Sequence, residues 1–129
     1  MARSQSASQT AGPYVHIGCT PNFAGLENMY GGHELGAEMF SSDAVGTWMT
    51  VTGQIFDGDG MPVTDAMLEF WQTDASGRYA PHGGSEGWGR RAVDAEEARY
   101  KLRTILPAGL GCEAPHIKVW IVARGINLG

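Results

Sequence analysis

The sequence is poor in cysteine and has no long apolar run. Its two cysteines, Cys19 and Cys112, lie far apart in the chain and match neither a disulfide framework nor a zinc site. No run approaches the roughly 18 apolar residues that would predict a membrane-spanning helix. Residues 1–10 also lack the apolar stretch of a signal peptide. We therefore expect a cytoplasmic protein with reduced thiols and no membrane partner.

Positive charge is also scarce. The chain has 9 Lys and Arg residues against 14 Asp and Glu residues, a net charge of −5, which argues against a nucleic-acid partner. With 43% apolar residues it can bury a core, so we expect one folded domain over residues 1–129. Residues 1–9 are small and polar, and we expect them to form a mobile arm.

Apolar and polar residues alternate with a period of two in several short segments, which is typical of half-buried strands. Turn signals separate them, and no segment has the apolar stripe of a long helix. The fold class predicted is all-β, a β-sandwich of mostly antiparallel strands with long irregular loops. We expect a strand or extended segment over 13–17, an irregular stretch over 18–45, a glycine-rich loop over 80–91, at most a helical turn over 92–98, and strands over 47–56, 66–72, 99–106 and 116–123.

The segment 116–123 is the most apolar of these strands, and we expect it in the centre of a sheet. A central strand needs a neighbour on each side, and only five residues follow Arg124. We therefore expect the sandwich to be incomplete at the C-terminus.

Two patterns that could bind a metal are weak. Asp57-Gly58-Asp59-Gly60 has no glutamate at the twelfth position of a calcium loop, which is Leu68, so it predicts a hairpin turn. The four histidines are isolated, without the spacing that places two ligands on one face of a helix or strand. Only His116 stands in a segment with further features.

That segment, Ala114-Pro115-His116-Ile117-Lys118, resembles the iron-binding strand of intradiol ring-cleavage dioxygenases, where a proline precedes a His-x-His pair. Residues i and i+2 of a strand project to the same side, so both histidines can reach one metal ion. The resemblance runs from about residue 8 to the end. Further blocks match the family in order: 9–14, 51–57, 68–74, 76–79, 87–90, 104–109 and 123–127.

The resemblance implies Fe(III) held by two tyrosinates and two histidines, and this chain departs from that set. Lys118 replaces the second histidine, and an ammonium group has no lone pair for a metal. Neither tyrosine is present, since 107–111 and 80–85 contain none and Tyr79 matches a turn residue of the family. His116 is then a vestige, and we expect no metal or catalytic residue here. The resemblance implies an α-type subunit that pairs with an iron-binding β-type subunit of the same fold, in a hetero-oligomer.

In such a subunit, the resemblance assigns substrate binding to Thr10, Gly12, Pro13 and Tyr14, with Arg124 adding positive charge. An arginine fork suits a small aromatic substrate that bears a carboxylate. Plainer interpretations stay open: residues 10–14 can simply lead the chain into its first strand, and Arg124 can form an ordinary surface ion pair at the sheet edge.

Two other functions also stay open. A self-sufficient intradiol dioxygenase predicts a wine-red protein when the chain alone is supplied with iron. A non-enzymatic β-sandwich binding module predicts that a β-type partner gains neither activity nor stability from the chain.

The expected incompleteness of the sandwich gives a direct prediction. Residues 1–129 alone should be poorly soluble or molten, because the central strand lacks part of its cover. Circular dichroism during heating checks this, and a sharp cooperative transition contradicts it.

Overall fold

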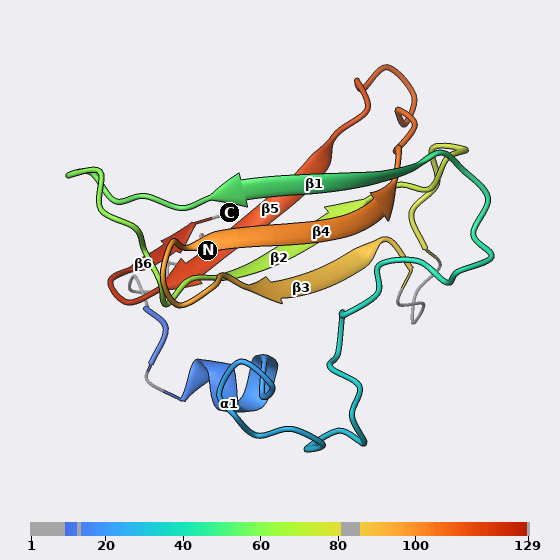
Figure 1. The fold of residues 1–129 in the computed structure, drawn as a ribbon. Coiled ribbons are helices and arrows are strands. Elements are labelled where there is room, and N and C mark those ends of the chain that lie inside the picture. The colour runs from blue at the N-terminus through green and yellow to red at the C-terminus, as the bar shows by residue number, and fades with distance from the viewer. Residues whose placement is uncertain (1–9, 13, 81–85, 129) are drawn as a thin grey trace, which may run out of the picture.

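The computed structural model describes residues 10–12, 14–80 and 86–128, the side chains of 126–128 excepted, so the arm 1–9 and Pro13 lie outside it. It confirms an all-β fold with long irregular loops (Figure 1). The described elements are α1 (Val15–Cys19), β1 (Trp48–Gln54), β2 (Met67–Gln72), β3 (Trp88–Ala92), β4 (Arg99–Ile105), β5 (Ile117–Ala123) and β6 (Ile126–Leu128).

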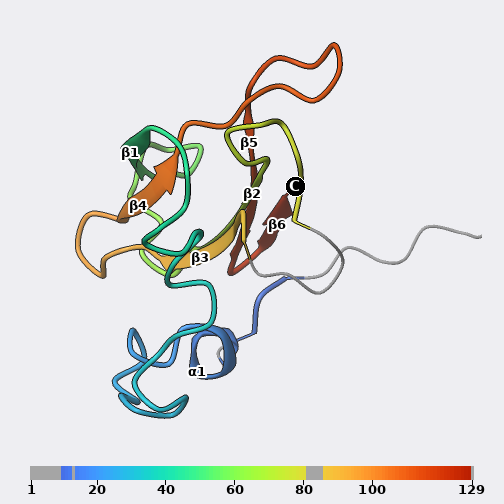
Figure 2. The same cartoon turned by 90° about the vertical axis from the view of Figure 1, so that its right-hand side faces the viewer.

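The strands form two antiparallel sheets. One has the order β1-β4 and the other the order β3-β2-β5-β6. Figure 2 shows the β1-β4 sheet on one side of the larger sheet. The prediction that the most apolar strand is internal is confirmed, because β5 lies between β2 and β6. The β6 strand pairs with the last three residues of β5, Ile121–Ala123.

The core lies between the two sheets, and the period of two decides which side chains enter it. Along β4, Leu102 and Thr104 are buried while Lys101 and Arg103 are exposed, as the alternation predicted. Phe70 of β2 faces the same side, with its ring 5.4 Å from that of Tyr100. The irregular stretch before β1 adds two further core residues, Met39 and Phe40.

A buried glutamine links the two sheets. The Gln72 Nε2 group donates to the Ile105 carbonyl at 2.8 Å and to the Thr73 carbonyl at 3.1 Å, and its Oε1 accepts from the Thr104 hydroxyl at 2.8 Å. The amide is thus satisfied although it is 1% exposed. In a low-dielectric core such bonds hold the sheets in one register, because breaking them leaves buried polar atoms unpaired.

The expectation of a strand over 13–17 was wrong, because Val15–Cys19 is a short helix. Its β-branched residues favour an extended chain, and side-chain contacts outside the segment override that preference. His16 bonds to the Thr20 hydroxyl at 2.7 Å and to the Asp65 carbonyl at 3.1 Å. In the part of the chain that is described, no helix is long and apolar enough to cross a membrane.

The expectation of a loop over 80–91 was also wrong, because β3 begins at Trp88. The glycines that suggested a loop allow close packing instead. A Cβ on Gly89 would collide with the Met39 side chain, and one on Gly87 would lie 2.5 Å from the Gln72 carbonyl oxygen. Gly87 also has a φ of +79°, a conformation that disfavours other residues.

The Gln72 link gives a testable prediction. Gln72→Met should lower the free energy of unfolding by about 2–3 kcal/mol, because the Thr104 hydroxyl and the Ile105 carbonyl lose their buried partner. Because the chain alone is expected to be molten, native-state proteolysis should be carried out on its complex with the expected β-type subunit, where cleavage follows the population of the open form. Gln54→Met is the matched control: its amide donates to the Glu97 carbonyl at an exposed site, so about 1 kcal/mol or less is expected. Equal losses in both variants contradict the prediction.

Candidate functional site

The outer face of the larger sheet carries a row of large side chains beside the start of β5. Because Leu68 and Phe70 of β2 enter the core, Trp71 faces outward. The strand register places Trp88 of β3 on one side of Trp71 and Lys118 of β5 on the other. Lys118 stands where the resemblance expects the second iron-binding histidine.

Lys118 lies within an aromatic cluster. Its Nζ is 5.6 Å from the centre of the Tyr79 ring, and that ring stacks on Trp71 at 6.0 Å with an interplanar angle of 14°. An open groove of about 300 Å³ runs beside them, and Trp88 and Trp120 also line it. The ammonium group is therefore held by a cation–π contact at the position where a metal ligand would stand.

His116 lies just before β5 and is partly buried. Its Nδ1 makes a 2.8 Å hydrogen bond with the Ala114 carbonyl. A carbonyl only accepts, so Nδ1 carries the proton and Nε2 is left as the one ring nitrogen able to bind a metal.

This donor set does not fit ferric iron. Lys118 offers no lone pair while it is charged, and Tyr79 is stacked flat against Trp71. The described residues contain no cluster of three or more His, Cys, Asp or Glu side chains suited to a metal. Residues 81–85, which include His82 and lie where the family has a tyrosine ligand, are outside the described part and contain no tyrosine.

A second cluster lies at the far end of β5. The Thr10 hydroxyl donates to the Ala123 carbonyl at 2.9 Å and accepts from the Gly125 amide, so the N-terminal segment is held against the β5–β6 turn. Gly12 and Arg124 line one cavity of about 280 Å³ there, and its other lining residues are Ala11, Val15, His16 and Asp65.

The structure thus brings together three of the substrate-binding residues expected from the resemblance, Thr10, Gly12 and Arg124. Tyr14 is 76% exposed and is not among the residues that line the cavity. The Arg124 Nε lies 3.4 Å from the Asp65 Oδ2, and the Arg124 side chain is 81% exposed. Asp65 was missed at the sequence level, because a single aspartate in a turn carries no signal.

The two clusters cannot serve one ligand within this chain. They lie at opposite ends of β5, and the eight steps from residue 116 to residue 124 correspond to roughly 26 Å of extended chain. A small ligand in the Arg124 cavity is therefore out of reach of this chain's own His116 and Lys118.

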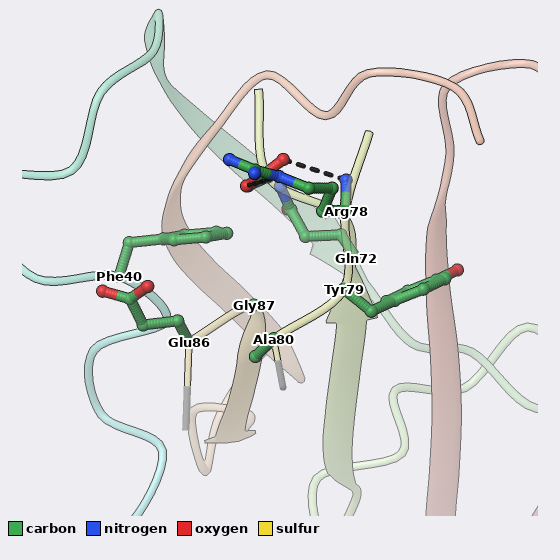
Figure 3. Close-up of a pocket in the computed structure, with 8 residues that line it drawn as sticks. Phe40, Gln72, Arg78, Tyr79, Ala80, Glu86 and Gly87 are labelled. Atoms are coloured by element: carbon green, nitrogen blue, oxygen red, sulfur yellow. Dashed lines mark hydrogen bonds and ion pairs between the residues drawn. The ribbon is translucent and has the colours of Figure 1, made fainter. Parts of the chain in front are cut away.

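A third cavity, of about 350 Å³, lies beside the 74–78 turn. Figure 3 shows Phe40 and Arg78 on opposite sides of it, while the Tyr79 ring points away. Asp74 accepts hydrogen bonds from the Ser76 hydroxyl and from the Ser76 and Arg78 amides. Burial raises the pKa of Asp74, but these bonds and the Arg78 charge lower it by more, so the net pKa lies below the usual value. The charges of Asp74 and Arg78 therefore stabilise the 74–78 turn, and they suggest no catalytic role.

The family profile described as "Dioxygenase" matches residues 20–127 of this chain. That is more than half of the sequence, and the chain belongs to this family of intradiol dioxygenases.

Individual proteins are also similar to this chain. The chain is 38% identical to the protocatechuate 3,4-dioxygenase alpha chain of Pseudomonas putida, over 96% of this chain and 65% of the relative. It is 36% identical to the alpha chain of Burkholderia cepacia, over 95% of this chain and 64% of the relative. The Burkholderia cepacia beta chain is 34% identical over 52% of this chain and 32% of its own length. This chain therefore spans just under two thirds of the alpha chains.

A solved structure has the same fold. It is the dioxygenase domain of a dioxygenase carbohydrate-binding protein fusion from Streptomyces sp. SirexAA-E, with 29% sequence identity and a TM-score of 0.64. The match covers 71% of this chain and 59% of that one.

The donor set leads to a prediction about iron. Lys118→His restores two histidines two residues apart at the start of β5, but it supplies neither tyrosinate, so both the variant and the unchanged chain should stay colourless when loaded with Fe(III). The visible absorption spectrum of the purified chain checks this. Lys101→His, at an exposed position of β4, controls for non-specific binding by a new histidine. A phenolate-to-iron absorption band in the unchanged chain contradicts the prediction and favours a self-sufficient dioxygenase.

Proposed function

We propose that this chain acts as the alpha subunit of a protocatechuate 3,4-dioxygenase and completes the substrate pocket of an iron-bearing beta subunit. The assembled enzyme would cleave protocatechuate between its two hydroxyl-bearing carbons with O2, giving 3-carboxy-cis,cis-muconate. Fe(III) would be bound by the beta subunit alone, in a cytoplasmic hetero-oligomer of the two kinds of chain.

One observation carries this proposal: the pocket cluster and the vestigial metal position lie at opposite ends of β5. A chain that retained its own iron would need its substrate-binding residues near His116. Here the residues expected to bind a substrate lie around Arg124 instead, and we infer that they serve a neighbouring chain.

The comparisons support the alpha assignment over the beta one. The match to the Pseudomonas putida alpha chain covers 96% of this chain, whereas the match to the Burkholderia cepacia beta chain covers 52%. The longer match includes the N-terminal segment and the β5–β6 turn, which form the Arg124 cavity.

Arg124 suits the carboxylate of protocatechuate. Its side chain is 81% exposed and lines a cavity that Ala11 and Gly12 of the N-terminal segment also line. An arginine presents two parallel N–H donors to a carboxylate and stays charged at any physiological pH. We infer that Arg124 binds or steers that carboxylate, while Thr10 and Gly12 shape the wall beside it.

Co-production with a beta-type chain tests the proposal. The partner should contain an intact His-x-His pair and two spaced tyrosines, and the neighbouring reading frame is the place to seek it. The pair should copurify and consume O2 with protocatechuate, and activity should fall when this chain is omitted. A beta-type partner that gains neither activity nor stability from this chain overturns the proposal and leaves the binding module.

Substitution of Arg124 tests its assigned role. Arg124→Gln in the copurified pair should raise the KM for protocatechuate about tenfold, because a charge-assisted hydrogen bond to the carboxylate is lost. The KM for catechol, which has no carboxylate, should stay within about twofold. Arg99→Gln is the matched control, since Arg99 is an exposed arginine of β4 paired with Glu97 at 2.5 Å. A similar change for both substrates contradicts the role.

A further inference from the structure

We propose that Asp65 is a positioning residue that holds the Arg124 guanidinium and thereby sets the preference for a carboxylated ring. The inference rests on the proposed function, because it concerns how the same cavity distinguishes its substrates. Neither residue type nor spacing marked Asp65 in the sequence. Its role follows from four features of its surroundings: the contact with Arg124, the support from α1, an unpaired oxygen, and the shared cavity.

The first feature is which nitrogen of Arg124 makes the contact. Asp65 Oδ2 lies 3.4 Å from Nε, the nitrogen nearest the chain. A guanidinium is planar and rigid, so an anchor at Nε fixes the plane of the whole group. A guanidinium can bind a carboxylate in a bidentate pair through either of two edges. One edge includes Nε, and the other is formed by the two terminal nitrogens. The Asp65 contact therefore orients the guanidinium and leaves the edge with the two terminal nitrogens for the substrate carboxylate.

The second feature is that Asp65 is itself held in place. The Asp65 carbonyl can only accept, so the 3.1 Å contact with His16 requires a proton on Nε2. In the neutral ring Nδ1 then accepts from the Thr20 hydroxyl, at 2.7 Å. The imidazole also packs against Phe23, with 4.5 Å between ring centres. Helix α1 thus fixes the backbone of Asp65 beside the cavity, which explains why a helix replaces the expected strand there.

The third feature is an unpaired oxygen. Asp65 Oδ1 is buried and has no hydrogen-bond partner among the described residues. A buried acceptor without a donor opposes folding, and an apolar side chain would avoid that cost. Stability therefore does not explain the presence of a carboxylate at this position. That presence is explained if the charge is needed to hold Arg124.

Two opposite effects on the substrate follow from the Asp65 charge, and they can be told apart. The carboxylate repels a negatively charged substrate, which would raise the KM for protocatechuate. It also fixes Arg124, whose long side chain would otherwise lose rotamer freedom on binding, and this lowers the KM. We infer that the second effect is larger, because Asp65 contacts Arg124 directly, whereas the repulsion acts at a longer distance and solvent around the 81% exposed Arg124 side chain screens it.

The test uses the copurified alpha–beta pair and steady-state O2 consumption. Asp65→Asn should raise the KM for protocatechuate about three- to fivefold, the range expected for a partly exposed ion pair, with kcat unchanged. The KM for catechol should not change. In an Arg124→Gln background the same substitution should have no further effect, because the residue through which Asp65 acts is gone. Asp65→Glu should recover part of the loss.

Asp59→Asn provides the matched control, since it removes the same charge from an exposed turn. A lower KM for protocatechuate in Asp65→Asn overturns the inference in favour of repulsion. Equal changes for both substrates, or an undiminished effect in the Arg124→Gln background, overturn it in favour of a purely structural role. These results require an active unchanged pair. If the unchanged pair is inactive with every catechol, the proposed function itself is wrong. That result is distinct from a failure of the Asp65 inference, which requires an active pair.

Discussion

The antiparallel pairing of β5 with β2 is the constraint on which both clusters depend. Its register sets Lys118 opposite Trp71, so the lysine that replaces a metal ligand joins an aromatic cluster on the outer face. The same strand delivers the chain to Arg124 at its other end, where the N-terminal segment meets the β5–β6 turn. This strand thus keeps Lys118 apart from the cavity beside Arg124. The proposal that this chain completes a pocket beside another chain's metal rests on that separation.

The N-terminal segment and α1 give this arrangement its second support. Thr10 is bonded on both sides of the turn that carries Arg124, and His16 holds the backbone of Asp65. On the outer face of the sheet, the Arg90–Glu69 ion pair is largely buried, and Arg90 also reaches the Cys19 carbonyl at the end of α1 at 3.4 Å. A largely buried pair of this kind defines how α1 docks more than it adds stability. The cavity around Arg124 is therefore built by contacts between distant parts of the chain.

Much of the sheet could be predicted from the sequence, because alternation directly records which face of a strand is buried. Leu102 and Thr104 show this on β4, and the apolar run of β5 correctly indicated an internal strand. The failures have a common cause in tertiary contacts. Gly89 indicated a loop although it lets β3 pack against Met39, and the β-branched residues of α1 indicated a strand. For the site, the resemblance supplied Thr10, Gly12 and Arg124, but the contact that joins Thr10 to Ala123 spans 113 residues and has no local signature. Asp65 had none either.

The iron content of the assembled pair is the most direct test of the central claim, that this chain serves a metal it does not bind. Metal analysis of the copurified alpha–beta complex, with each chain quantified separately, gives the number of iron ions per pair. The account predicts one iron per pair, all of it retained by the beta-type chain when the two are separated. Two irons per pair, or iron that remains with this chain, would contradict it.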